Sequence, residues 1–209
     1  NSYHWFRIKI KPNPDSEQHW ILEFFDQTID DITLFVPDEN NNYSSYKFGD
    51  TYNFKEREYK HKNFTYNLKN DTAAEKTYYI RLKSSQSASV IVVLRSVKRF
   101  LEYAVEEYLF FGLFYGMILV FGLYNLLMFF AIRQKQYLYY VLYNLSIGFY
   151  EMCIDGIAFQ YIWPNSPWFN QYAYGLSLCL SSVFGLLFTL KFLYVRSKAP
   201  SLYKLIVGV

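Results

Sequence analysis

Aromatic and arginine side chains recur two residues apart in two segments of the N-terminal half. Trp5 precedes Arg7, and Tyr79 precedes Arg81. In an extended strand, residues two apart share one face of the sheet. An aromatic ring can stack on a sugar ring, and a guanidinium group can donate paired hydrogen bonds to a carboxylate. These four residues are therefore predicted to bind a small, saccharide-like ligand, with a cross-strand ladder that only stabilises the sheet as the alternative.

Asp50 and Arg57 form a second candidate ligand-binding pair, in the polar segment that follows Gly49. A carboxylate and a guanidinium group can both hydrogen-bond a polar ligand. In the alternative interpretation, Gly49 supplies a turn residue with positive φ, and the two charged side chains pair with each other and hold the loop.

Polar residues interrupt the apolar C-terminal half at regular spacing. Asn144, Gly148, Glu151 and Asp155 are four, three and four residues apart, and thus lie along one stripe of a helix. Carboxylates are costly in contact with lipid, so the stripe is expected to face the interior of a helix bundle. One hypothesis is a polar hinge whose partners change between signalling states. The alternative is a static polar cluster or a water-filled outer vestibule.

Asn125 and Asn144 each close a Leu-Tyr-Asn triplet. Each lies 9.5 residues from the midpoint between residues 134 and 135. In a hairpin of two straight helices the two amides would lie at one depth and are predicted to pair. The alternative is a hydrogen bond from one amide to a carbonyl of its own helix. Gly112 and Gly116 suit close helix packing, for which we favour a partner within the chain over a homodimer.

The distribution of charged residues divides the chain into a polar N-terminal half and an apolar C-terminal half. Residues 1–108 contain 15 of the 21 Lys and Arg and 16 of the 18 Asp and Glu. The uncharged run of 24 residues from Leu109 to Ile132 would form a helix about 36 Å long, enough to cross a bilayer. Further apolar stretches cover about 137–163 and 171–195, and another starts at 201. These runs predict transmembrane helices, with core helices of a large soluble protein as the alternative.

Basic residues set the expected orientation of these helices. They follow the first and third apolar stretches, whereas residues 164–170 carry no charge. Because basic residues concentrate on the cytoplasmic side, the N-terminal domain is expected to lie outside. The basic residues are Arg133, Lys135, Lys191, Arg196 and Lys198.

Residues 1–100 show the alternation of short β-strands, separated by clusters of Pro, Asn and Asp. Several short strands at this spacing predict an antiparallel β-sandwich. We expect a short connection near residues 101–107 before the helices, although the good helix formers of residues 102–107 would also let the first helix begin several residues before the membrane. The strands are predicted at residues 4–10, 20–25, 30–36, 76–82 and 90–94.

Catalytic and cofactor-binding patterns do not emerge from the sequence. His4, His19 and His61 lack the spacing of metal ligands, and the sequence contains no Gly-rich phosphate loop or nucleophile–histidine set. The net charge of +3 and the lack of a basic stripe argue against nucleic acid as a partner. We expect no metal, no cofactor and no enzyme activity in this chain. The chain starts without Met and ends within an apolar run, so we expect it to be part of a longer protein.

Several motifs occur in an order that makes the chain similar to a known family of membrane proteins. In the polar half these are Tyr3-His4-Trp5-Phe6-Arg7-Ile8, Gly49-Asp50 followed by Phe54 and Arg57, and Thr77-Tyr78-Tyr79-Ile80-Arg81. In the apolar half they are Gly112-Leu-Phe-Tyr-Gly116, Leu123-Tyr124-Asn125, Tyr137-Leu-Tyr-Tyr140 and Gly156-Ile-Ala-Phe-Gln-Tyr-Ile-Trp163. With them the chain resembles the bacterial seven-transmembrane receptors with diverse intracellular signalling modules.

The resemblance implies a fold, a location and an output. Residues 1–100 would be the family's type 2 extracellular domain, a periplasmic jelly-roll sensor related in shape to carbohydrate-binding modules. Residues 101–209 would be the first part of a seven-helix module in the bacterial inner membrane. Beyond them the family continues into a cytoplasmic histidine kinase, nucleotide cyclase, phosphatase or DNA-binding domain.

A transmembrane signalling receptor is therefore the leading functional hypothesis, with a lipid bilayer and a small, saccharide-like molecule as partners. One alternative is a membrane-anchored adhesion or scaffold protein without signalling output. Another is a transporter or intramembrane enzyme that uses Glu151 and Asp155.

Overall fold

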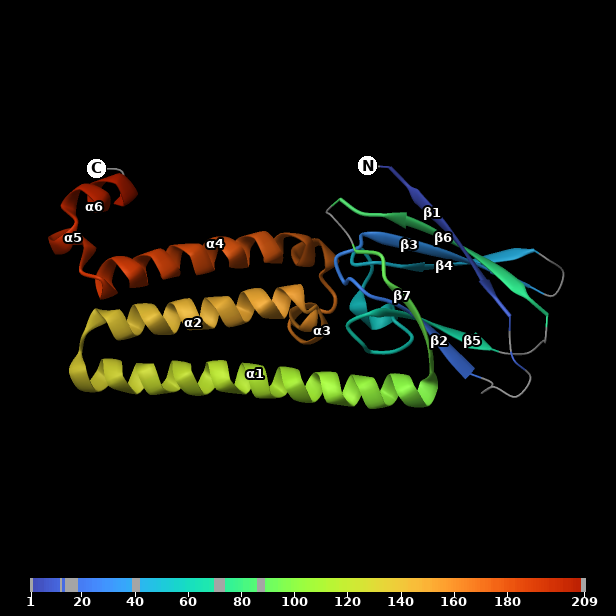
Figure 1. Ribbon diagram of the computed structural model, residues 1–209, viewed down its shortest axis with the longest axis horizontal. Coiled ribbons are helices and arrows are strands. Elements are labelled where there is room, and N and C mark those ends of the chain that lie inside the picture. Colours follow the sequence, from blue (N-terminus) through green and yellow to red (C-terminus); the bar gives the residue numbers. More distant parts are fainter. Residues whose placement is uncertain are drawn as a thin grey trace. The chain divides into compact units, whose positions relative to one another are not determined.

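The computed structural model describes residues 2–11, 13, 19–38, 42–69, 74–85 and 89–207. Within these ranges the polar half forms seven β-strands and a short 3-10 helix, η1 (Phe54–Glu56), and the apolar half forms α-helices (Figure 1). The predicted order, strands first and helices after, is confirmed.

Two antiparallel sheets make up the N-terminal part, as predicted (Figure 1). The four-stranded sheet has the order β1 (His4–Ile10), β6 (Lys76–Lys83), β3 (Asp31–Pro37) and β4 (Tyr43–Phe48). The three-stranded sheet has the order β5 (Phe64–Lys69), β2 (His19–Phe24) and β7 (Val92–Ser96).

The core lies between the two sheets and is built by alternate residues of each strand. In the four-stranded sheet, Leu34 lies opposite Ile80 in the register of β3 and β6, and both side chains are fully buried. From the other sheet, Leu22, Phe24 and Phe64 join the same cluster. Burying one such side chain stabilises a fold by roughly 1.5–3 kcal/mol, so this layer is the main source of stability for the sandwich.

Strands β4 and β5 were not predicted from the sequence. In β4 the run Tyr43-Ser-Ser-Tyr-Lys-Phe48 does not alternate, because it lies at a sheet edge with most of its side chains exposed. In β5, alternation is present in Phe64, Tyr66 and Leu68, and it is a signal that sequence reasoning could have used.

The outer face of the three-stranded sheet is covered rather than solvated. Ile21 and Glu23 point away from the core cluster, yet both are fully buried. Phe100, at the start of the first helix, lies over this face and packs edge-on against Tyr59 and His61.

Helix α1 (Val97–Ile132) begins at the residue after β7 ends. The segment near residues 101–107, predicted as a short connection, is therefore helical, in agreement with the expectation that the first helix begins several residues before the apolar run. Glu102, Ala104 and Glu106 favour a helix intrinsically, and Tyr103 anchors this turn through ring contact with Phe25.

The apolar stretch that follows is divided into α2 (Lys135–Ile154) and the short α3 (Ile157–Tyr161). Gly156 separates them with φ of +74°, a conformation that other residues adopt at a cost. A Cβ atom at this position would lie 3.0 Å from Cγ of Gln27, so the site also demands a small residue.

Helix α4 (Pro167–Phe192) is followed by two shorter helices, α5 (Val195–Lys198) and α6 (Pro200–Val207). Helix α2 contacts both α1 and α4 (Figure 1). On one side Gly148 packs against Ile118, and on the other the Tyr143 ring stacks on Phe188. Of the described helices, α1 and α4 are long and apolar enough to cross a membrane.

Candidate functional site

The outer face of the four-stranded sheet brings together four of the predicted ligand-binding residues. Trp5 lies directly opposite Arg81 in the register of β1 and β6, and Arg7 lies directly opposite Tyr79. The Trp5 side chain is 59% exposed, so its ring remains open to a ligand. The alternation seen in the sequence placed these residues correctly on one face.

Two further aromatic rings extend this face, and sequence reasoning missed both. Phe35 of β3 stacks on Trp5, with ring centroids 5.6 Å apart and an interplanar angle of 21°. Tyr43 of β4 meets Tyr79 edge-on at 5.6 Å. Phe35 occupies an outward position of β3, where an apolar ring is a detectable signal, whereas Tyr43 lies on a strand that was not predicted.

Arg81 lies among these rings with one donor group to spare. Its Nη2 donates to Oγ1 of Thr33 at 3.1 Å, and its guanidinium carbon lies 4.7 Å from the centroid of Tyr3. The buried Nε has no hydrogen-bond partner among the described residues. Buried donors are nearly always satisfied, so this nitrogen is an exception on the sheet face.

Asp50 and Arg57 lie elsewhere, in the connection between β4 and β5 (residues 49–63). Gly49 has φ of +148°, and a Cβ atom there would collide with the carbonyl group of Asp30, which confirms the glycine as a turn residue. The Arg57 guanidinium carbon lies 4.3 Å from the ring centroids of both Phe54 and Phe64. Arg57 thus holds the connection together, and a role in ligand contact stays a prediction.

Residues 154–171, here called the outer segment, pack against this connection. The Phe54 N–H donates to the Pro164 carbonyl at 2.9 Å, and the Gln160 amide donates to the Lys60 carbonyl at 3.0 Å. The Phe159 ring is 2% exposed and meets Phe54 edge-on at 5.6 Å. Because polar and apolar contacts coincide, the outer segment is docked specifically on the sandwich domain.

Asp50 is part of the same interface and has an unusual acidity. Burial and the nearby charge of Asp30 raise the pKa of the Asp50 carboxyl group to about 7. A hydrogen bond with Gln171 of the outer segment and the charge of Arg57 act in the opposite direction. This carboxyl group therefore changes its protonation state near neutral pH, whereas an ordinary aspartate does so near pH 4.

A buried ion pair lies beneath the start of α1. The Glu23 carboxylate, fully buried, accepts from Nε of Arg95 at 3.0 Å and from the amide of Asn63 at 2.7 Å. The Arg95 guanidinium carbon also lies 4.6 Å from the ring centroid of Tyr103. The sequence could not reveal this cluster, because Glu23 occupies an outward position of β2 that is covered only by distant residues.

The predicted pairing of Asn125 with Asn144 is wrong. The Asn144 amide donates to the Ile118 carbonyl on α1 at 2.8 Å, and the Asn125 amide donates to Phe121 of its own helix at 2.9 Å. The hairpin turn consists of residues 133 and 134, so position 123 rather than 125 lies at the depth of Asn144. Asn144 accordingly lies beside Gly122.

The remaining polar residues of the helical part have less defined surroundings. Glu151 lies on α2 and Asp155 just beyond its end, both half-buried, and their switching role stays a prediction. Cβ atoms built at Gly112 and Gly116 meet no described atom within 4 Å, so the described residues do not supply the partner expected for this pair. No group of three described His, Cys, Asp or Glu residues could hold a metal ion.

Comparisons with known proteins assign both halves of the chain. Residues 1–96 match the family model described as 7TMR-DISM extracellular 2, and residues 107–209 match the model described as 7TM diverse intracellular signalling. No curated protein and no solved structure matches the chain significantly. With an extracellular sensing domain of two sheets followed by apolar helices, the chain belongs to the seven-transmembrane receptors with diverse intracellular signalling modules.

Proposed function

We propose that the sandwich domain of this receptor binds a small, saccharide-like ligand on the outer face of its four-stranded sheet. The domain would lie in the periplasm and the helices in the bacterial inner membrane, and a cytoplasmic output domain would receive the signal. The observation that supports this ligand class most directly is the row of aromatic and arginine side chains on one open sheet face.

The chemistry of this face favours an acidic sugar. The exposed Trp5 ring, backed by Phe35, offers a flat apolar platform for the C–H face of a pyranose. Arg7 and Arg81 flank the platform with positive charge. A guanidinium group binds carboxylate in a bidentate manner, so a uronic acid would use both features.

The outer segment supports a route for the signal. Its residues lead along the chain into α2 on one side and belong to α4 on the other. They are docked on the connection of residues 49–63, while β7 continues directly into α1. A ligand-induced shift in the sandwich would thus reach three helices through bonded or tightly packed residues.

Calorimetric titration of the full chain in lipid nanodiscs tests the ligand class. We expect a galacturonate oligosaccharide to bind more tightly than the neutral galactose oligosaccharide of the same length. Trp5→Ala should weaken binding of the uronate at least about tenfold, because loss of a stacked aromatic contact costs about 1.4 kcal/mol or more. Arg81→Gln should remove the preference for the acidic sugar.

Trp168→Ala is the matched control, since Trp168 is 71% exposed and lies in the outer segment rather than on the sheet. It should leave uronate binding unchanged. Binding that is insensitive to Trp5→Ala and Arg81→Gln would contradict a ligand site on this sheet face.

A further inference from the structure

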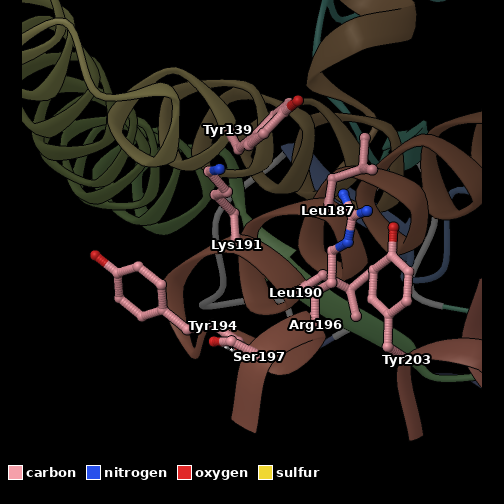
Figure 2. A pocket seen from close by; sticks show the side chains of 8 residues that line it. All are labelled: Tyr139, Leu187, Leu190, Lys191, Tyr194, Arg196, Ser197 and Tyr203. Carbon is pink, nitrogen blue, oxygen red and sulfur yellow. Dashed lines mark hydrogen bonds between the residues drawn. The ribbon is translucent and has the colours of Figure 1, made fainter. Parts of the chain in front are cut away.

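A cavity of about 520 Å³ lies at the far end of α4, within the helical part of the chain (Figure 2). Leu187 and Leu190 of α4 form an apolar wall, and Tyr139 of α2 and Tyr203 of α6 contribute rings. Lys191 and Arg196 also line the cavity. In Figure 2 the polar ends of Lys191, Arg196 and Tyr203 point the same way, toward the side of Tyr139.

The charge around this cavity is positive and lacks acidic residues to balance it. Residues 108–150 and 156–209 contain six basic side chains and no Asp or Glu. Glu151 is twelve residues beyond Tyr139 along α2, a distance of about 18 Å. Two cations that share an amphipathic cavity favour an anionic group between them.

The cavity faces the cytoplasmic side of the membrane. Because the N-terminal domain of the family is extracellular, α1 runs inward, α2 runs back outward and α4 runs inward again. The end of α4, with Lys191, therefore lies at the inner leaflet. That leaflet carries the anionic lipids that attract basic residues at helix ends.

We propose that this cavity binds the headgroup of an anionic phospholipid from the inner leaflet. The phosphate lies between Lys191 and Arg196, which bind it as a point charge and as a planar fork respectively. Tyr139 and Tyr203 line the same cavity, and a tyrosine hydroxyl group can donate to a phosphate oxygen. Leu187 and Leu190 contact the upper part of the acyl chains. The site is independent of what the sandwich domain binds.

Native mass spectrometry of the full chain, titrated with dioleoylphosphatidylglycerol or dioleoylphosphatidylcholine, tests this site. We expect phosphatidylglycerol to bind more tightly than phosphatidylcholine. Each of Lys191→Gln and Arg196→Gln should weaken its binding about fivefold, and the double variant about 25-fold, whereas binding of the choline lipid should not change. Arg196→Lys keeps the charge and should lose less than Arg196→Gln.

Arg133→Gln combined with Lys135→Gln is the matched control. It removes the same charge at the same end of the helices, from residues that do not line the cavity. Its binding of phosphatidylglycerol should stay within about twofold of the parent, since only long-range attraction is lost.

Three results would overturn the proposal. Equal losses in both double variants would mean that general surface charge, not the cavity, attracts the lipid. No loss in either would mean that another part of the protein occupies the cavity. Displacement of the lipid by excess inorganic phosphate would identify a soluble phosphate ligand instead. The single variants carry the test if the double variant fails to fold.

Discussion

Asp50 is the residue whose ionisation the fold changes most clearly. Its pKa rises from 3.8 to about 7, chiefly through burial. Between these two values the folded protein keeps a proton that the unfolded chain has released. The free energy of unfolding therefore decreases as the pH rises from about 4 to about 7, and this contribution is constant above that range.

Asp50→Asn should abolish this contribution while preserving the shape of the side chain. We expect the variant to equal the parent near pH 4 and to exceed it at pH 8, by up to roughly 4 kcal/mol. Urea unfolding of the full chain in micelles, followed by tryptophan fluorescence at both pH values, measures the difference. Glu58→Gln, which changes an exposed acid, is the control and should shift neither value appreciably. A difference in stability between variant and parent that is the same at pH 4 and pH 8 would contradict the raised pKa.

The sequence predicted part of the ligand-binding face, and around Asp50 it predicted the Gly49 turn and a charge interaction with Arg57 but not the burial. Alternation within a strand is a local property, so it placed Trp5 and Tyr79 on the outer face. The opposition of Trp5 and Arg81 depends on strand register, which joins residues 76 positions apart. The hydrogen-bond partner of Asp50 is Gln171, on a helix that belongs to the other half of the sequence.

At the scale of elements, the junction of β7 and α1 depends on a buried ion pair. Removing one member leaves the other charged and buried, which usually costs about 3–5 kcal/mol. Arg95→Met should destabilise the sandwich by that amount in urea unfolding. Glu23→Leu combined with Arg95→Met should recover much of the loss, because the pair is replaced by apolar contacts.

An exposed ion pair in the same domain provides the comparison. Lys9 lies 3.3 Å from Glu75, and both side chains are about half exposed. Lys9→Met should cost less than about 1 kcal/mol, since solvent screens such pairs. If Arg95→Met were no more harmful than Lys9→Met, the buried pair would not contribute to the junction.

Element boundaries were predictable where composition changes and not where tertiary contacts decide. The uncharged run from Leu109 set the apolar part of α1, but its first twelve residues are helical because Phe100 and Tyr103 pack on the sandwich. The end of α2 follows from Gly156, which has a positive φ and where a Cβ atom would come within 3.0 Å of Gln27. A lone glycine in an apolar run did not signal this break.

At the scale of the whole molecule, the outer segment is the part of the apolar half that packs against the sandwich domain. Phe159→Ala would leave a cavity between Phe54 and Arg57, and loss of a buried phenylalanine costs roughly 3–5 kcal/mol. We expect amide hydrogen exchange in residues 53–62 to become faster in this variant, with binding at the outer sheet face unaffected. Phe130→Ala, which removes a ring that is 62% exposed, should leave exchange in 53–62 unchanged. Equal protection in both variants would show that the packing of Phe159 does not stabilise this interface.

The passage from β7 to α1 without an intervening residue also restricts how the length of α1 can change. Phe100 anchors the first turns to the sandwich, and Ile118 accepts a hydrogen bond from α2 further along the same helix. Each residue inserted between these two anchors would rotate one relative to the other by about 100° around the helix axis. Seven residues would rotate them by only about 20° in total. Insertions or deletions that keep both anchors on the same faces of α1 therefore come in steps of about seven residues.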